Sequence, residues 1–129
     1  MQINSAKDLD VYNQAYALAM EIFQKSKSWP AEEKYSLTDQ IRRSSRSVCA
    51  NLKEAWSKRL YSAHFVNKLT DCDGENSETG TWLDFAYSCG YLSSEDFERL
   101  SQLCRQIGGM LGAMLKSPSS FLIKPTTNC

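Results

Sequence analysis

Apolar side chains recur every three or four residues through four successive segments of this chain, at about residues 8–27, 30–58, 60–89 and 93–116. This spacing places them on one face of an α-helix, and no segment shows the alternation of a half-buried strand. Four long helices with short connections predict an all-α fold, an antiparallel up-down-up-down four-helix bundle. A chain of 129 residues suits one such domain, so we expect a single domain.

Three of the four segments carry an unbroken stripe that is apolar at nearly every position. The stripe of the first segment consists of Leu9, Tyr12, Tyr16, Ala19 and Phe23. The stripe of the second consists of Leu37, Ile41, Ser44, Val48, Leu52 and Ala55. The stripe of the fourth, which is the clearest, consists of Phe97, Leu100, Cys104, Ile107, Leu111 and Met114. Pro30 suits the first turn of the second helix, and Gly90 suits the left-handed position after the third.

The third segment keeps the helical period, but its middle is polar and contains Gly74 and Gly80. Each glycine costs about 1 kcal/mol relative to alanine inside a helix. Either a loop over 73–80 joins two short helices, or one long helix uses its small residues for close packing. We favour the long helix, because the apolar phase that precedes Asp71 resumes at Leu83 without a slip.

The two ends of the chain indicate where in the cell the protein is expected and which residues are expected to be flexible. The N-terminal run MQINSAKDLDVYNQ lacks a basic region followed by an apolar one, and no stretch approaches the ~20 apolar residues of a membrane helix. We therefore expect a cytoplasmic protein without membrane contact, whose five cysteines are reduced. The segment over 117–129 predicts a flexible tail, in which Phe121-Leu122-Ile123 either docks or stays mobile.

The residues that catalysis needs are scarce. His64 is the single histidine, and Cys72 lies two helical turns from it, roughly 12 Å along the axis, too far for a hydrogen bond. One histidine cannot supply the paired Glu-x-x-His motifs of a di-metal bundle, and the cysteines form no CxxC pair. Gly108-Gly109 falls inside the fourth helix rather than in a phosphate-binding loop. We predict no enzyme activity, no metal and no cofactor; a hydrolase or metal protein built on carboxylates alone is the weakest hypothesis.

Charge is distributed unevenly along a chain whose net charge is zero. Residues 71–98 hold eight acids and no lysine or arginine, whereas residues 42–59 hold one acid and six basic residues. Those six are Arg42, Arg43, Arg46, Lys53, Lys58 and Arg59. Three hypotheses fit this pattern: phosphate contacts with a nucleic acid, a solvated or salt-bridged face, and a head-to-tail interface between the basic face of one copy and the acidic segment of the next.

One long run of the sequence, WPAEEKYSLTDQIRRSSRSVCANLKEA, resembles the signature of the bacterial four-helix-bundle proteins encoded in 23S ribosomal RNA intervening sequences. The matching residues are Trp29-Pro30 with Glu33, Leu37 with Gln40-Ile41-Arg42-Arg43, and Ser47-Val48 with Asn51-Leu52 and Glu54. Later blocks match at Gly74 with Glu78 and at Cys89-Gly90-Tyr91-Leu92. The likeness extends in order over nearly the whole chain and departs at two positions. Ala55 stands where the family usually has glycine, and Glu75 where it usually has serine.

The resemblance implies a four-helix bundle that assembles as a ring, commonly a pentamer. It also implies kinship with the accessory variability protein of diversity-generating retroelements, which binds nucleic acid and a reverse transcriptase. On this basis we expect a homo-oligomer whose candidate partners are RNA, DNA, and a reverse transcriptase or other nucleoprotein. The resemblance does not imply an enzyme.

The polar residues shared with the family predict a structural network. Gln40, Arg43, Asn51, Glu54 and Glu78 lie in or beside the apolar stripes, and buried polar groups must be paired. We therefore predict that Arg43 pairs with Glu54 or Glu78 between the second and third helices. That pairing removes Arg43 from the surface that binds nucleic acid. The remaining binding candidates are Arg42, Arg46, Lys53, Lys58 and Arg59.

Overall fold

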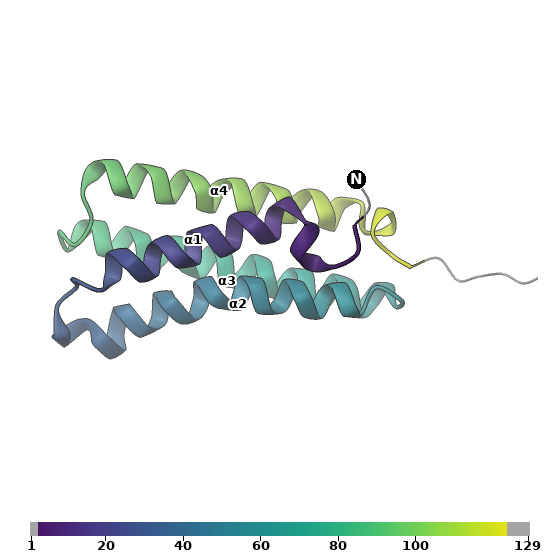
Figure 1. The fold of residues 1–129 in the computed structure, drawn as a ribbon, viewed down its shortest axis with the longest axis horizontal. Helices are drawn as coiled ribbons and strands as arrows, with labels where there is room; N and C mark the ends of the chain where they lie inside the picture. The colour runs from purple at the N-terminus through teal and green to yellow at the C-terminus, as the bar shows by residue number, and fades with distance from the viewer. Residues whose placement is uncertain (1–2, 124–129) are drawn as a thin grey trace, which may run out of the picture.

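The long α-helices of this chain pack side by side, and consecutive helices run in opposite directions (Figure 1). They are α1 (Asp10–Ser26), α2 (Asp39–Ser57), α3 (Ser62–Ser88) and α4 (Ser94–Lys116). This computed structural model describes residues 3–123, and no β-strand occurs among them. The predicted all-α four-helix bundle is confirmed. Within the same range, no helix has both the length and the apolar character to cross a membrane.

Helices α1 and α3 both pack mainly against α2 and α4. The α1–α2 face of the bundle therefore lies opposite the α3–α4 face. The core between the helices is apolar, and burial of each large side chain contributes about 1.5–3 kcal/mol. Side chains at most 1% exposed include Ile22, Ile41, Leu52, Phe65, Leu69, Leu83, Leu100, Ile107 and Leu111. Tyr16 belongs to the stripe predicted for the first helix, but its side chain is 54% exposed. The core side of α1 is occupied by Ala15, Leu18 and Ala19 instead.

Helix α2 begins later than the range 30–58 predicts. A 3₁₀ turn over Ala31–Glu33 and a π-helical turn over Lys34–Thr38 precede the regular helix. The wider hydrogen-bonding ring of a π turn inserts one residue into the helical register. Leu37 and Thr38, adjacent residues of this turn, are both buried.

Helix α3 runs without a break through the stretch 73–80, as the preserved apolar phase predicts. Its polar middle bonds to both neighbouring helices. Asn76 Nδ2 donates to the Cys104 carbonyl on α4 at 2.9 Å, and Thr79 shares a buried hydrogen bond of 2.8 Å with Ser44 on α2. The polar residues in this stretch therefore fasten one helix to two others, and they do not mark a loop.

The turn between α3 and α4 is set by its terminal residues. Gly90 has a φ of 81°, the left-handed conformation predicted for it. The N–H groups of Gly90 and Tyr91 donate back to carbonyls in the last turn of α3, which is a Schellman motif. Ser93 Oγ then accepts the N–H of Asp96 and caps α4. The Asp96 carboxylate pairs with Lys25 at 3.0 Å and ties this end of α4 to α1.

The described part of the segment over 117–129 packs against the bundle, so of the two alternatives left open for Phe121-Leu122-Ile123 the docked one is present. The Phe121 ring lies 6.4 Å from that of Phe65, a core residue of α3. The Ile123 N–H donates to the Arg59 carbonyl at 3.1 Å. Apolar contact and one backbone hydrogen bond thus dock Phe121-Leu122-Ile123 on the bundle. The remainder of the tail lies outside the described residues.

Candidate nucleic-acid interface

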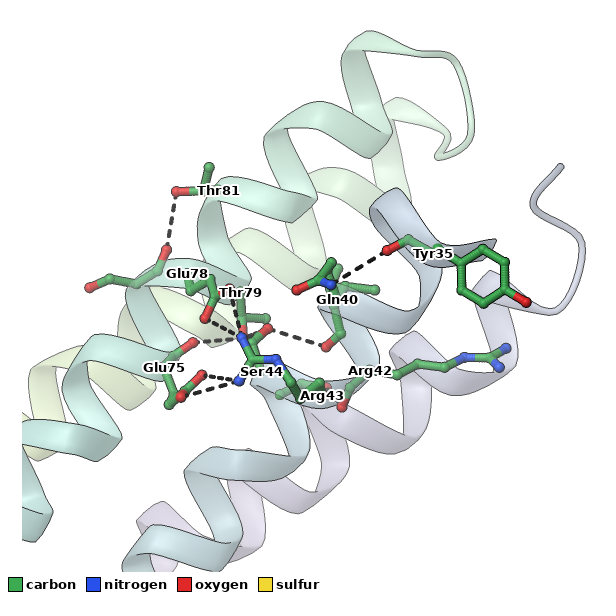
Figure 2. Close-up of polar contacts among 12 residues, drawn as sticks. Tyr35, Gln40, Arg42, Arg43, Ser44, Glu75, Glu78, Thr79 and Thr81 are labelled. Atoms are coloured by element: carbon green, nitrogen blue, oxygen red, sulfur yellow. Dashed lines mark hydrogen bonds and ion pairs between the residues drawn. The ribbon is translucent and has the colours of Figure 1, made fainter. Parts of the chain in front are cut away.

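Two consecutive arginines of α2 extend toward different neighbours in the bundle (Figure 2). Arg42 reaches α1, where its Nε donates to Ser26 Oγ at 2.8 Å and its guanidinium lies 4.8 Å from the centre of the Phe23 ring. Arg43 reaches α3 instead. Successive helical residues are about 100° apart around the axis, so one arginine contributes to the α1–α2 face while the other joins α2 to α3.

Arg43 lies between two carboxylates of α3, as Figure 2 shows. Its Nη2 donates to both oxygens of Glu78 at 2.7 and 2.6 Å, and its Nη1 donates to Glu75 at 3.3 and 3.2 Å. Of the two predicted partners, Glu78 is the one present. The pairing with Glu54 is wrong, because that carboxylate binds Lys68 at 2.8 Å. The prediction missed Glu75, although its spacing of three from Glu78 places both acids on one helix face.

This ion-pair network affects its two carboxylates in opposite directions. The hydrogen bond from Arg43 holds the pKa of Glu78 below its usual value. Burial raises the pKa of Glu75, and the adjacent Glu78 adds to that effect. The Arg43 side chain is 48% exposed, so the network is partly solvated and not the buried cluster expected from sequence.

Besides Glu54, two more predicted members of the network lie outside it. Gln40 Nε2 donates to the Tyr35 carbonyl at 3.4 Å, on the exposed side of the π turn. Asn51 is half-buried two helical turns beyond Arg43, and within residues 3–123 no hydrogen bond joins the two. A buried side-chain hydrogen bond does join α2 to α3, but it lies between Ser44 and Thr79, both 0% exposed.

Three of the five predicted binding residues form a row on α2, here called the basic stripe: Arg42, Arg46 and Lys53. Separations of four and seven residues place them within about 40° around the helix and extend the row by roughly 17 Å. Arg46 and Lys53 are exposed, and Arg42 is half-buried. Among residues 3–123 no acid forms an ion pair with any of the three. Their charges are therefore open to a partner.

The other two predicted binding residues lie beyond the last residue of α2, Ser57. The Arg59 guanidinium lies 3.7 Å from the centre of the Trp56 ring, and its Nε donates to the Trp56 carbonyl at 2.8 Å. Lys58 is exposed. These residues add positive charge at the α2–α3 turn but do not continue the basic stripe.

Phe23 on α1 gathers three cations around its ring. Lys27 Nζ lies 4.8 Å from the ring centre, and the guanidinium carbons of Arg42 and Arg46 lie at 4.8 and 5.6 Å. Each such contact contributes about 0.5–1 kcal/mol at an exposed site. The sequence prediction missed Lys27, which belongs to the positive surface only because α1 packs against α2. The short connection that follows Lys27 is the sequence signal that reveals this proximity.

The metal-ligating and nucleophilic side chains of residues 3–123 can be placed one by one. No cluster of histidine, cysteine, aspartate or glutamate there could hold a metal ion. Burial raises the pKa of Cys72 to about 12 and those of Cys49 and Cys104 to about 11, so these thiols are protonated near neutral pH and are poor nucleophiles. His64 is exposed, with its ring 5.6 Å from that of Tyr61.

The family model described as "23S rRNA-intervening sequence protein" matches residues 7–113. The chain belongs to this family. The resemblance carried by the α2 sequence is thereby confirmed. The matched region of this 23S rRNA-intervening sequence protein includes the whole of α1, α2 and α3 and most of α4, so both the Arg43 network and the basic stripe fall inside it.

A solved structure supports the same placement. The chain is 29% identical to a protein of unknown function from the S23 ribosomal protein family of Bacteroides thetaiotaomicron, known from its crystal structure. The two superpose with a TM-score of 0.74, covering 83% of this chain and 96% of the other. Among curated proteins, none matches this chain. The family match thus stands beside a solved structure of the same fold, and the function of that neighbour is itself unknown.

Proposed function

We propose that this protein is a non-enzymatic, ring-forming bundle that binds nucleic acid, alone or within a nucleoprotein, through the positive surface between α1 and α2. The observation that carries the proposal is the unpaired state of the basic stripe. Lys25, Arg43, Lys68 and Arg99 all pair with acids of this chain. The basic stripe makes no such pair within residues 3–123, although eight acids lie between residues 71 and 98.

The geometry of this surface suits a phosphate backbone. Lys27, Arg42 and Arg46 meet at Phe23, and Lys53 continues the charge along α2. Hydrogen bonds and ring contacts orient Arg42 before any ligand arrives, which lowers the entropy lost on binding. A row of cations roughly 17 Å long can contact several consecutive phosphates. Each contact releases counterions and makes the affinity depend on salt.

Binding of RNA and of DNA across a salt series tests the proposal. We expect both to bind at low salt, with log Kobs falling linearly as log salt concentration rises. Fluorescence anisotropy with labelled oligonucleotides measures this directly. Absence of binding to either nucleic acid even at the lowest salt contradicts the proposal.

A second candidate function is structural assembly alone, in which the basic stripe pairs with an acidic face of the next copy. A groove of about 430 Å³ between α3 and α4 favours it, since two acids, Asp73 and Asp84, line that groove against one basic residue, Arg105. This face and the α1–α2 face are different surfaces, so a contact between them is head-to-tail, and such contacts form a ring when the rotation from one copy to the next closes. By kinship we favour a pentamer for such a ring.

Light scattering on Arg46→Glu separates the two candidates. If the basic stripe is the subunit interface, the variant loses its oligomeric mass, and Asp84→Lys in the same chain restores it. If the stripe binds nucleic acid, the mass stays unchanged while the affinity for RNA falls.

A further inference from the structure

A hollow beside the basic stripe has no role in the proposal above. It lies between α1 and α2, has a volume of about 260 Å³, and is here called the Tyr16 groove. Its lining consists of Tyr12, Tyr16, Ala19, Met20, Arg46 and Cys49. Arg46 is thus shared between this apolar groove and the basic stripe, so a ligand that contacts one lies beside the other.

The aromatic wall of the groove is open to a ligand. The rings of Tyr12 and Tyr16 are stacked, with centroids 6.3 Å apart and an angle of 27° between their planes. Tyr12 is buried and packs against Tyr16, whereas Tyr16 is 54% exposed and Met20 is 42% exposed. A ring held in place by a buried neighbour presents a fixed π-surface at little cost in side-chain entropy.

A cation lines each of the two hollows that Tyr16 borders. Arg46 lies in the Tyr16 groove, and Lys7 lies with Tyr16 in an adjoining hollow of about 250 Å³. No acid lines either hollow. The one thiol present, Cys49, is neutral near neutral pH because burial raises its pKa to about 11, so nothing in the lining repels a phosphate.

We propose that the Tyr16 groove holds an unpaired base of a single-stranded nucleic acid, which stacks on Tyr16 while its flanking phosphates contact Arg46 on one side and Lys7 on the other. This rests on the proposed function and names the class of nucleic acid. Single-strand-binding proteins combine a positive track for the backbone with aromatic rings for the bases. In a duplex the bases are already stacked inside the helix, so no base is free to stack on Tyr16.

Single-stranded RNA carrying a central 2-aminopurine, and the same RNA as a duplex, provide the test. Stacking on Tyr16 quenches 2-aminopurine fluorescence in the single strand. Tyr16→Ala weakens single-strand binding by about 5- to 150-fold, the range that one lost stacking contact produces, and leaves duplex binding unchanged. Tyr16→Phe keeps the ring and retains both affinity and quenching. Phe85→Ala is the matched control, because Phe85 is also 54% exposed but lies on α3.

Three other outcomes overturn the inference. Single-strand affinity that Tyr16→Ala leaves intact shows that the groove takes no base, although the proposed function survives. A change of oligomeric mass in Tyr16→Ala shows that a second copy fills the groove. Absence of binding to any nucleic acid removes the inference together with the proposed function.

Discussion

Arg43 Nη2 lies 2.7 and 2.6 Å from the two carboxylate oxygens of Glu78. This contact joins α2 to α3 and neutralises one arginine of a pair whose other member, Arg42, turns toward α1. The division of the two side chains separates the basic segment into a structural part and an open part. The structural part affects the free energy of unfolding and the open part affects ligand binding, so the two effects can be measured separately.

The Arg43–Glu78 contact predicts a specific dependence of stability on pH. Its hydrogen bond lowers the pKa of Glu78 in the folded state, so its contribution to stability is present above the unfolded pKa and is lost as pH falls through the folded one. Glu78→Gln should cost roughly 0.5–1 kcal/mol near neutral pH, as a part-exposed ion pair does. Its Tm should then approach that of the wild type as pH falls to about 3.

Glu75→Gln is the control for that experiment. Burial raises the pKa of Glu75, so ionisation of this carboxylate opposes folding. Its effect on stability as pH rises is therefore opposite in sign to that of Glu78. The variant should lose less stability near neutral pH than Glu78→Gln. Equal losses for the two, with the same pH profile, contradict the assignment of the stronger pairing to Glu78.

The buried hydrogen bond between Ser44 and Thr79 predicts that small polar residues are needed here. Ser44→Ala removes the shared bond but leaves the Thr79 hydroxyl donating to the Glu75 carbonyl, so the free energy of unfolding should fall by about 1 kcal/mol. Ser44→Leu should destabilise by about 1–3 kcal/mol through overpacking. Urea unfolding at a fixed protein concentration measures both. A leucine variant more stable than the wild type refutes the need for close approach of α2 and α3.

The glycines of α3 and its C-terminus predict substitutions of opposite sign. A Cβ added at Gly74 meets no atom within 4 Å, so Gly74→Ala should stabilise the helix by about 1 kcal/mol. Gly90 has a φ of 81°, so Gly90→Ala should destabilise it by about 1–2 kcal/mol. Thermal unfolding of the two variants checks the pair. Destabilisation by Gly74→Ala means that this position faces a partner absent from the single chain.

Lys27 and Lys25 offer a matched test of the positive surface. Lys27 joins the cations at Phe23, whereas Lys25 pairs with Asp96. Lys27→Gln should weaken RNA binding about two- to fivefold, corresponding to roughly 0.5–1 kcal/mol for an exposed charge contact. Lys25→Gln should leave it unchanged, as anisotropy titrations can show. If Lys25→Gln weakens RNA binding more than Lys27→Gln does, the interface lies away from the α1–α2 side.

Periodicity alone predicts the fold because each helix places its apolar residues toward one core. It even predicts the continuity of α3, since Leu83 resumes the phase that Leu69 and Cys72 set, and all three are buried. The π turn before α2 has no such signature, because it shifts the register only locally. Docking of Phe121 on Phe65 cannot be predicted from periodicity, since contacts across more than fifty residues leave no local pattern.

The candidate site was only partly predictable. Spacing on one helix identifies Arg42, Arg46 and Lys53 as a row, because that geometry is local. It cannot add Lys27 or Tyr16, which reach the same surface from α1. Nor can it choose between Glu54 and Glu78 as the partner of Arg43, since that choice depends on the register of α3 against α2.

The salt dependence of single-stranded RNA binding tests the central claim most directly. We compare the wild type with Arg46→Gln/Lys53→Gln and with Lys25→Gln/Lys68→Gln, whose lysines pair with acids of the same chain. Both double variants remove two positive charges. The account predicts that the slope of log Kobs against log salt falls by about 1.4 in the first, from about 0.7 per phosphate contact, and stays unchanged in the second. Equal slopes in all three proteins contradict it.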